Sequence, residues 1–191
     1  MRLEYQVLAA LLLDVVFGDP RWVPHPVRLM GGLARRLETM TRALLPARLA
    51  GVVTALALIG TSGGVVFGLL ELAGWIHPWA EEILSVLLLY TTFAASDLAL
   101  HARNVDRALE EGDLEEARRR VGMIVGRDTE ALDERGVVRA TVETVAENTV
   151  DGVTAPLFFA CLFGPVGAMV YKAINTLDST FGYKNERYLH F

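Results

Sequence analysis

Two long stretches of the chain carry no charged residue and alternate with polar segments. Residues 49–70 and residues 152–171 contain no Asp, Glu, Lys or Arg, and about 20 apolar residues suffice for a helix to cross a bilayer. Residues 83–100 form a third apolar stretch, with Asp97 near its end. This pattern predicts an all-α protein, a polytopic helical integral membrane protein.

A shorter apolar stretch over residues 3–17 is interrupted by Glu4 and Asp14. A signal peptide is one interpretation, but its positively charged region would hold only Arg2, and an acid would lie in its apolar core. We therefore expect a short first membrane helix. An acid inside such a helix is either a functional group or a buried, hydrogen-bonded structural one, and both alternatives apply equally to Asp97.

The charged residues between the apolar stretches predict the orientation of the chain. Residues 18–48 form a predicted loop with six Arg against two acids, whereas residues 71–82 contain acids and no basic residue. Because cytoplasmic loops are enriched in Arg and Lys, the first loop is expected inside and the second outside. The chain then divides into N-terminal membrane helices (1–100), a cytoplasmic helical insert (101–151) and a membrane segment followed by a polar motif (152–191).

The insert has the local signals of short helices. Gly112 is typical of a helix end, and Asp113 with Glu116 resembles a capping box at the next helix start. A bend is expected at Gly136. The predicted helices cover residues 102–111, 114–125 and roughly 130–150.

Glycines recur in the stretch 49–70. Gly60, Gly64 and Gly68 follow one another every four residues, so they share one helix face. Since small residues let membrane helices approach closely, we expect another helix to pack against this face.

The last apolar stretch contains helix-breaking residues. Pro156 lies near its start, and Gly164, Pro165 and Gly167 lie near its middle. Proline removes a helical hydrogen bond, and unpaired backbone is tolerated in a membrane only where protein or water covers it. The residues predict either one kinked span or a re-entrant pair of half-helices.

A proline-rich cluster follows the first apolar stretch. Its three prolines hold an extended backbone that presents Asp19, His25 and Arg28. The guanidinium of Arg28 suits phosphate or carboxylate. The plainer interpretation is a loop at the membrane interface, in which arginine only sets topology.

A stripe of acids precedes the last apolar stretch. Glu143, Glu147 and Asp151 follow Arg139 at intervals of four residues, and Asn148 lies beside them, so they lie on one helix face. Carboxylate oxygens suit Mg²⁺. The alternative is an exposed helix face with one Arg–Glu pair.

A further polar cluster follows the last apolar stretch. Lys172, Asn175 and Ser179 share one helical face, and Asp178 is adjacent. Polar residues directly after an apolar stretch are costly unless paired. They indicate either a site or a polar exit from the membrane.

Composition excludes several classes. The chain has 191 residues, of which 52% are hydrophobic and 21% charged, and a net charge of −5. This charge argues against a nucleic-acid partner, and the single cysteine, Cys161, excludes an intramolecular disulfide. No P-loop or dinucleotide-binding glycine motif occurs. The sequence is compatible with an oligomer.

The three polar clusters occur in long, specific stretches. These are LLLDVVFGDPRWVPHPVRLMG (11–31), GRDTEALDERGVVRATVETVAENTVDGVTAPLFF (126–159) and YKAINTLDSTFGYKNERY (171–188). In them the chain resembles the adenosylcobinamide-phosphate synthase family of cobalamin biosynthesis. The resemblance implies a membrane protein that joins adenosylcobyric acid, a corrinoid, to an aminopropanol phosphate through an amide, with ATP as a substrate and Mg²⁺. Family members are longer, so the resemblance also implies a chain truncated at its C-terminus.

Such a ligase activates a carboxylate with ATP before an amine attacks it. The site needs metal ligands, cationic groups for phosphate and protection from water. His25 or Asp19 would take a proton from the attacking ammonium. The expected metal ligands are Glu143, Glu147 and Asp151; the expected catalytic residues are Asp19, His25, Lys172 and Asp178; the expected substrate- or phosphate-binding residues are Arg28, Arg127, Asn148, Asn175, Lys184 and Arg187.

The implied reaction bears on topology, because ATP is cytoplasmic. It favours the re-entrant alternative, which returns the polar motif after residue 171 to the cytoplasm. We therefore expect a multi-pass protein of the inner (plasma) membrane, in contact with lipid, whose active site faces the cytoplasm. The alternative functions are a non-catalytic membrane subunit, a transporter-like binding protein or an inactive fragment of the enzyme.

Overall fold

The computed structural model describes residues 2–19, 25–126, 128–183 and 185–191. Within these ranges the secondary structure is helical and contains no strand, which confirms the predicted all-α class. The elements are α1 (Leu3–Phe17), α2 (Pro26–Leu44), α3 (Ala47–Ile76), α4 (Pro78–Tyr90), α5 (Ala95–Glu110), α6 (Leu114–Val121), α7 (Glu134–Thr149), the π-helical segment η1 (Val150–Thr154) and α8 (Ala155–Phe181).

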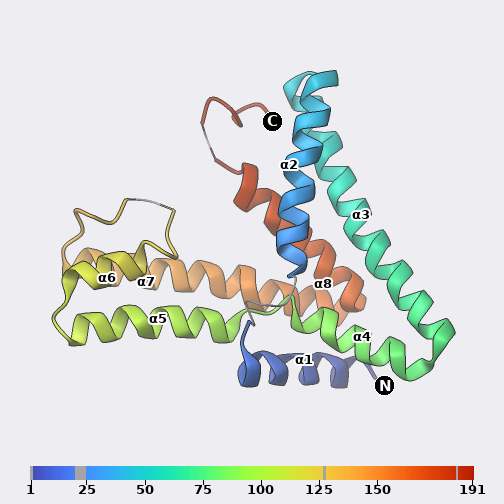
Figure 1. Ribbon diagram of the computed structural model, residues 1–191, viewed down its shortest axis with the longest axis horizontal. Coiled ribbons are helices and arrows are strands. Elements are labelled where there is room, and N and C mark those ends of the chain that lie inside the picture. The colour runs from blue at the N-terminus through green and yellow to red at the C-terminus, as the bar shows by residue number, and fades with distance from the viewer. Residues whose placement is uncertain (1, 20–24, 127, 184) are drawn as a thin grey trace.

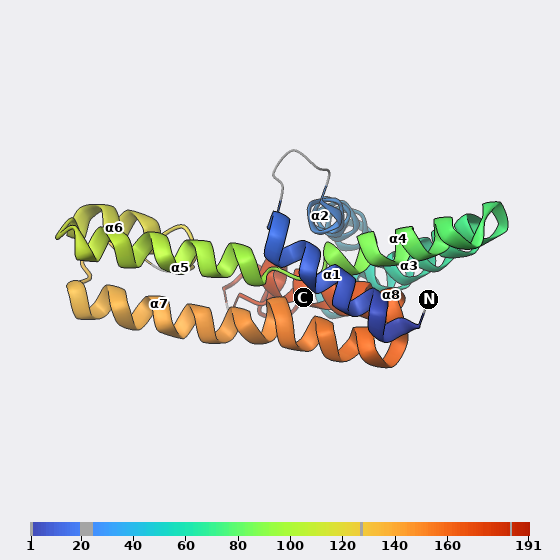
Figure 2. The same cartoon turned by 90° about the horizontal axis from the view of Figure 1, so that it is seen from below.

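The helices form two parts that meet around α8. In both views α5, α6 and α7 extend together to one side, whereas α2, α3 and α4 lie on the other side (Figure 1, Figure 2). Three helical stretches are long and apolar enough to cross a membrane: Ala47–Ile76, Pro78–Glu110 and Glu134–Phe181. Large apolar side chains of α3, such as Leu56 and Phe67, point outward and are 65% and 58% exposed. The chain is thus a polytopic helical membrane protein.

The predicted loop over residues 18–48 is wrong for residues 26–44, which form α2. His25 starts this helix, because its Nδ1 accepts the backbone N–H of Val27 at 3.3 Å, and Pro26 suits the first helical position. Buried positions then recur on one face, at Met30, Ala34 and the carboxylate-bearing Glu38. Four of the arginines that suggested a loop, Arg28, Arg35, Arg36 and Arg42, lie on an amphipathic helix packed on α3 and α8.

The predicted membrane span over residues 83–100 is interrupted. α4 ends at Tyr90 and α5 begins at Ala95. The buried carboxylate of Asp14 supports this break, because its Oδ2 accepts the N–H groups of Ala95 and Ser96 at 3.0 and 3.2 Å. The first N–H groups of a helix need such acceptors. Asp14 therefore has a structural role: its carboxylate caps the N-terminus of α5.

Replacing Asp14 by Ala is expected to lower the free energy of unfolding by about 1–3 kcal/mol, because two N–H groups lose their acceptor. Thermal unfolding in detergent micelles measures this loss. Glu4→Ala, on the same helix but exposed, is the control and should change stability little. Equal stability of the two variants would contradict the capping role.

The last apolar stretch folds back on itself. Gly164 has φ 64° and ψ −156° inside α8, and Pro165 follows it. The rings of Phe159 and Tyr171 stack across this break with centroids 5.1 Å apart. They would be roughly 18 Å apart in a straight helix. The structure therefore shows the pair of half-helices and not a single kinked span (Figure 1).

The insert largely follows its local signals. Gly112 has φ 73° after α5, and Asp113 Oδ1 accepts the N–H of Glu116 at 2.9 Å at the start of α6. The third helix begins later than predicted, at Glu134, and the expected bend at Gly136 is wrong. Gly136 lies in the first turn, where its N–H is capped by Asp133 at 2.8 Å.

The expected partner for the glycine face of α3 is absent from the described part of the chain. A Cβ added at Gly60, Gly64 or Gly68 would meet no atom within 4 Å. A Cβ at Gly63 would instead lie 3.0 Å from a side-chain atom of Val170 on α8. The face of α3 that packs carries Leu58 and its buried neighbours.

Candidate functional site

We call the chain reversal at Gly164 of α8 the hairpin. It brings the acidic stripe of α7 and η1 to the polar motif of α8. The carboxylate of Asp151 accepts hydrogen bonds from the Tyr171 hydroxyl and from Asn175 Nδ2, both at 3.0 Å. Asp151 and Asn175 are 24 residues apart, so they would lie roughly 36 Å apart in a straight helix. Two clusters that are separate in sequence therefore meet only because the chain reverses at Gly164.

A cavity of about 510 Å³ lies between these two helices. Six of the predicted site residues line it: Glu143, Glu147, Asn148, Asp151, Asn175 and Asp178. Asn148 donates its amide to the carbonyl of Thr144 at 2.9 Å, which leaves its side-chain oxygen as an acceptor. The cavity has the volume of a small-molecule site, and its wall is mainly acidic and amide in character.

A second cavity of about 270 Å³ adjoins the first, and both share Ile124, Asn148, Asp151 and Asn175. Lys172 of α8 and the pair Asp97 and His101 of α5 also line it. It therefore combines groups of both charges, while the larger cavity is dominated by carboxylates.

Lys172 is a nearly buried cation. It is 9% exposed, and its ammonium group has no hydrogen bond or ion pair with any described residue. Its positive charge interacts electrostatically with His25, Asp151 and Asp19. Because a buried charge without a partner is costly, this ammonium is suited to an anionic ligand entering the cavity.

Asp19, His25 and Arg28, the polar residues of the proline-rich cluster, form an N-terminal cluster whose member His25 interacts electrostatically with Lys172. His25 Nε2 is 3.9 Å from Asp19 Oδ1. Burial lowers the pKa of His25; Asp19 opposes this shift, and the charges of Lys172 and Arg28 add to it. Arg28 lies exposed in the first turn of α2. The structure thus pairs His25 with Asp19 and places both within the electrostatic range of Lys172.

The shift of His25 predicts a pH dependence of stability. Because the folded protein binds the proton less well than the unfolded chain, its free energy of unfolding should fall as pH is lowered through about 6.5. His25→Asn keeps a capping acceptor but does not titrate, so its stability should depend less on pH in that range. Chemical unfolding of both proteins at several pH values checks this. Parallel curves would contradict it.

The structure places Arg187 elsewhere. Its Nη2 lies 3.0 Å from the buried Oε1 of Glu38 on α2, and its backbone carbonyl accepts a hydrogen bond from Arg42 at 2.6 Å. It lines neither cavity. Arg127 and Lys184 lie outside the described residues.

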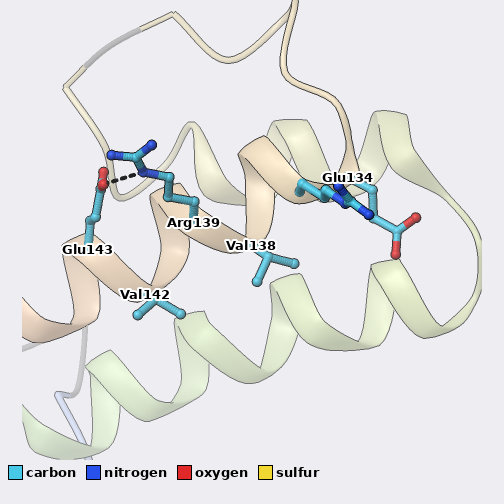
Figure 3. A pocket seen from close by; sticks show the side chains of 6 residues that line it. Glu134, Val138, Arg139, Val142 and Glu143 are labelled. Atoms are coloured by element: carbon cyan, nitrogen blue, oxygen red, sulfur yellow. Dashed lines mark hydrogen bonds and ion pairs between the residues drawn. The ribbon is translucent and has the colours of Figure 1, made fainter.

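The acids of α7 and η1 do not form a preassembled metal cluster. Glu143 pairs with Arg139 at 2.7 Å (Figure 3), and Asp151 accepts two hydrogen bonds. Among the described residues no three His, Cys, Asp or Glu side chains are grouped as metal ligands. Mg²⁺ usually takes one or two carboxylates and completes its shell with water and substrate phosphates. Glu147 and Asp178 both line the larger cavity, where they offer two carboxylates.

Sequence reasoning missed His101 and Tyr171. His101 lies four residues after Asp97, on the same face of α5, with Nε2 3.6 Å from Asp97 Oδ2. This i, i+4 spacing is visible in the sequence, but Asp97 was assigned to the end of a membrane span. Tyr171 begins the polar motif in the sequence, and only the fold of the chain reveals its hydrogen bond to Asp151.

Comparison with known proteins bears on the family of the chain. It is 51% identical to the cobalamin biosynthesis protein CobD of Geobacter metallireducens over 97% of its length and 58% of the relative's. It is 43% identical to CobD of Leptospira interrogans serogroup Icterohaemorrhagiae serovar copenhageni, over 99% of the chain and 60% of the relative. The chain is 47% identical to the cobalamin biosynthesis protein CbiB of Salmonella typhi, over 94% of the chain and 57% of the relative.

The chain thus spans about three-fifths of the length of these relatives. No solved structure matches it. The CobD/Cbib protein family model matches residues 7–191, and so the chain belongs to the CobD/CbiB family.

Proposed function

We propose that the chain acts in cobalamin biosynthesis as an ATP- and Mg²⁺-dependent ligase that joins adenosylcobyric acid to an aminopropanol phosphate through an amide bond. The names of the relatives, cobalamin biosynthesis proteins, support the pathway. The observation that carries the chemistry is the pair of adjoining cavities: carboxylates of α7 line the larger one, and Lys172, with its unpaired ammonium, lines the smaller one.

The larger cavity suits the nucleotide. Glu147 and Asp178 would hold Mg²⁺, which neutralises phosphate charge when bound. Asn148 and Asn175 offer amide groups beside it. Glu143 also lines this cavity, and the side chains of the Arg139–Glu143 pair are both exposed.

The smaller cavity suits the reacting groups. Lys172 would bind an anionic group, a carboxylate or a phosphate, because it has no other charged partner within ion-pair distance among the described residues. Its burial limits the access of water, which would otherwise hydrolyse an activated carboxylate. His25 or Asp19, whose charges interact with that of Lys172, is one candidate for the group that accepts a proton from the attacking ammonium.

A direct test measures ATP consumption by the chain in nanodiscs, with each organic substrate supplied alone and then with both together. The proposal expects ADP formation only when adenosylcobyric acid is present, and an amide product only when the amine is added. ADP formation that is independent of the corrinoid, or absent altogether, would contradict it.

We further propose that this chain lies in the plasma membrane with both cavities open to the cytoplasm. This orientation is supported by the location of ATP, which is in the cytoplasm. It is also supported by the acids and amides that line the larger cavity. In a Cys161→Ser background, Ser179→Cys should resist an impermeant thiol reagent in intact cells and react after permeabilisation. Labelling of intact cells would contradict this orientation.

A second candidate function is substrate binding or transport without catalysis. The helix broken at Gly164 favours it, because discontinuous helices form substrate sites in transporters. The same ATP assay separates the two, since a binding protein would retain corrinoid affinity without forming ADP.

A further inference from the structure

The smaller cavity contains a second histidine–carboxylate pair that the proposed function has not used. His101 Nε2 lies 3.6 Å from Asp97 Oδ2 on the same face of α5. Both residues line the cavity that Lys172, Asn175 and Asp151 complete from α8 and η1. This cavity is therefore bounded by an imidazole, an unpaired ammonium and two carboxylates.

The two histidines near Lys172 differ in what their nitrogens contact. His25 uses Nδ1 as the helix cap of α2, and its Nε2 faces Asp19. His101 has only Nε2 directed at a charged partner, Asp97; its Nδ1 has no hydrogen bond or ion pair with any described residue. A proton on Nε2 leaves Nδ1 of His101 as an available acceptor.

The charges of this cavity match a ligand that carries both signs. Lys172 is suited to an anion, and Asp97 is suited to a cation. Asp151 adds a second carboxylate, already held by Tyr171 and Asn175. A volume of about 270 Å³ is close to the lower limit for small-ligand sites. An amino-alcohol phosphate is small and has an ammonium and a phosphate in one molecule.

We propose that the smaller cavity binds the amino-alcohol phosphate, and that His101, positioned by Asp97, takes the proton from its ammonium. This rests on the proposed ligase function and assigns the amine its own subsite. The neutral amine then attacks the carbonyl carbon of the acyl phosphate. The C–N bond forms, the C–O bond to phosphate breaks, and a second proton leaves with the departing phosphate.

An amine that is already neutral separates this role from a structural one. Hydroxylamine is largely unprotonated at about pH 7, so it captures an acyl phosphate as a hydroxamate without needing a base. His101→Asn should lower amide formation with aminopropanol phosphate by about 100-fold or more. Hydroxamate formation should stay within about threefold of the unmodified chain.

Further variants keep the test decisive. Asp97→Asn should lower amide formation about tenfold with hydroxamate formation retained, and imidazole added to His101→Ala should restore part of the amide rate. His77→Asn, at the α4 cap, is the control and should match the unmodified chain. Folding of every variant is compared by circular dichroism and thermal unfolding.

Two outcomes would overturn the assignment. In the first, His101→Asn and His101→Gln lose both products together, or keep both. In the second, His25→Asn alone shows the selective loss of amide, which would make His25 the proton acceptor. If the unmodified chain forms neither hydroxamate nor amide, the proposed function itself fails, and this inference fails with it.

Discussion

Replacing Glu147 by Gln is expected to lower corrinoid-dependent ADP formation by about 100-fold or more, because the larger cavity loses the carboxylate best placed to hold Mg²⁺. Glu147 is exposed on α7, lines the cavity and has no hydrogen bond or ion pair with any described residue. Its substitution should therefore leave the fold intact. The rate is measured at several Mg²⁺ concentrations, and the half-saturating concentration should rise.

The matched control is Glu134→Gln, at the start of the same helix and also exposed. It carries the same change of charge outside both hairpin cavities, so its rate and Mg²⁺ dependence should be those of the unmodified chain. An unchanged rate for Glu147→Gln, or an equal loss in both variants, would show that Glu147 is not a metal ligand.

Replacing Gly164 by Ala is expected to destabilise the protein by about 1–3 kcal/mol, because a side chain disfavours the backbone conformation at this position. The reversal of the chain requires φ 64° and ψ −156° there. An added Cβ would meet only Leu3 Cδ1, at 3.8 Å, so the penalty comes from the backbone and not from a clash. Thermal unfolding in detergent micelles measures it.

Gly60→Ala is the control for this substitution. Gly60 lies inside α3 with no neighbour for a Cβ within 4 Å, so alanine should leave stability unchanged or raise it by up to about 1 kcal/mol. A Gly164→Ala protein as stable as the Gly60→Ala protein would mean that the hairpin does not depend on this glycine.

Local signals predicted much of the fold. The charge-free stretches correspond to α3 and to the hairpin around Gly164, and the signals at Gly112 and Asp113 mark real helix boundaries. The acids of α7 and the polar residues of α8 were found as separate candidates, since each has a helical spacing. Their meeting at Asp151 and Asn175 is a tertiary contact, which spacing alone does not encode.

The errors came from partners distant in sequence. Residues 26–44 look like a polar loop because their arginines dominate the composition, yet Glu38 is buried and paired with Arg187, 149 residues away. Asp14 looks like an isolated intramembrane acid until the start of α5 provides its two N–H groups. His101 was missed because its cavity exists only after α5 packs beside α7.

Cross-linking between α7 and α8 tests the central claim most directly, that the hairpin brings the two polar clusters into one site. In a Cys161→Ser background, Glu147→Cys and Ser179→Cys are introduced together, since both positions line the larger cavity. A short bifunctional thiol reagent should join them in membranes, and a Glu134→Cys, Ser179→Cys pair should stay unlinked. In a straight helix positions 147 and 179 would be roughly 48 Å apart. Failure of the first pair to cross-link would therefore contradict the account.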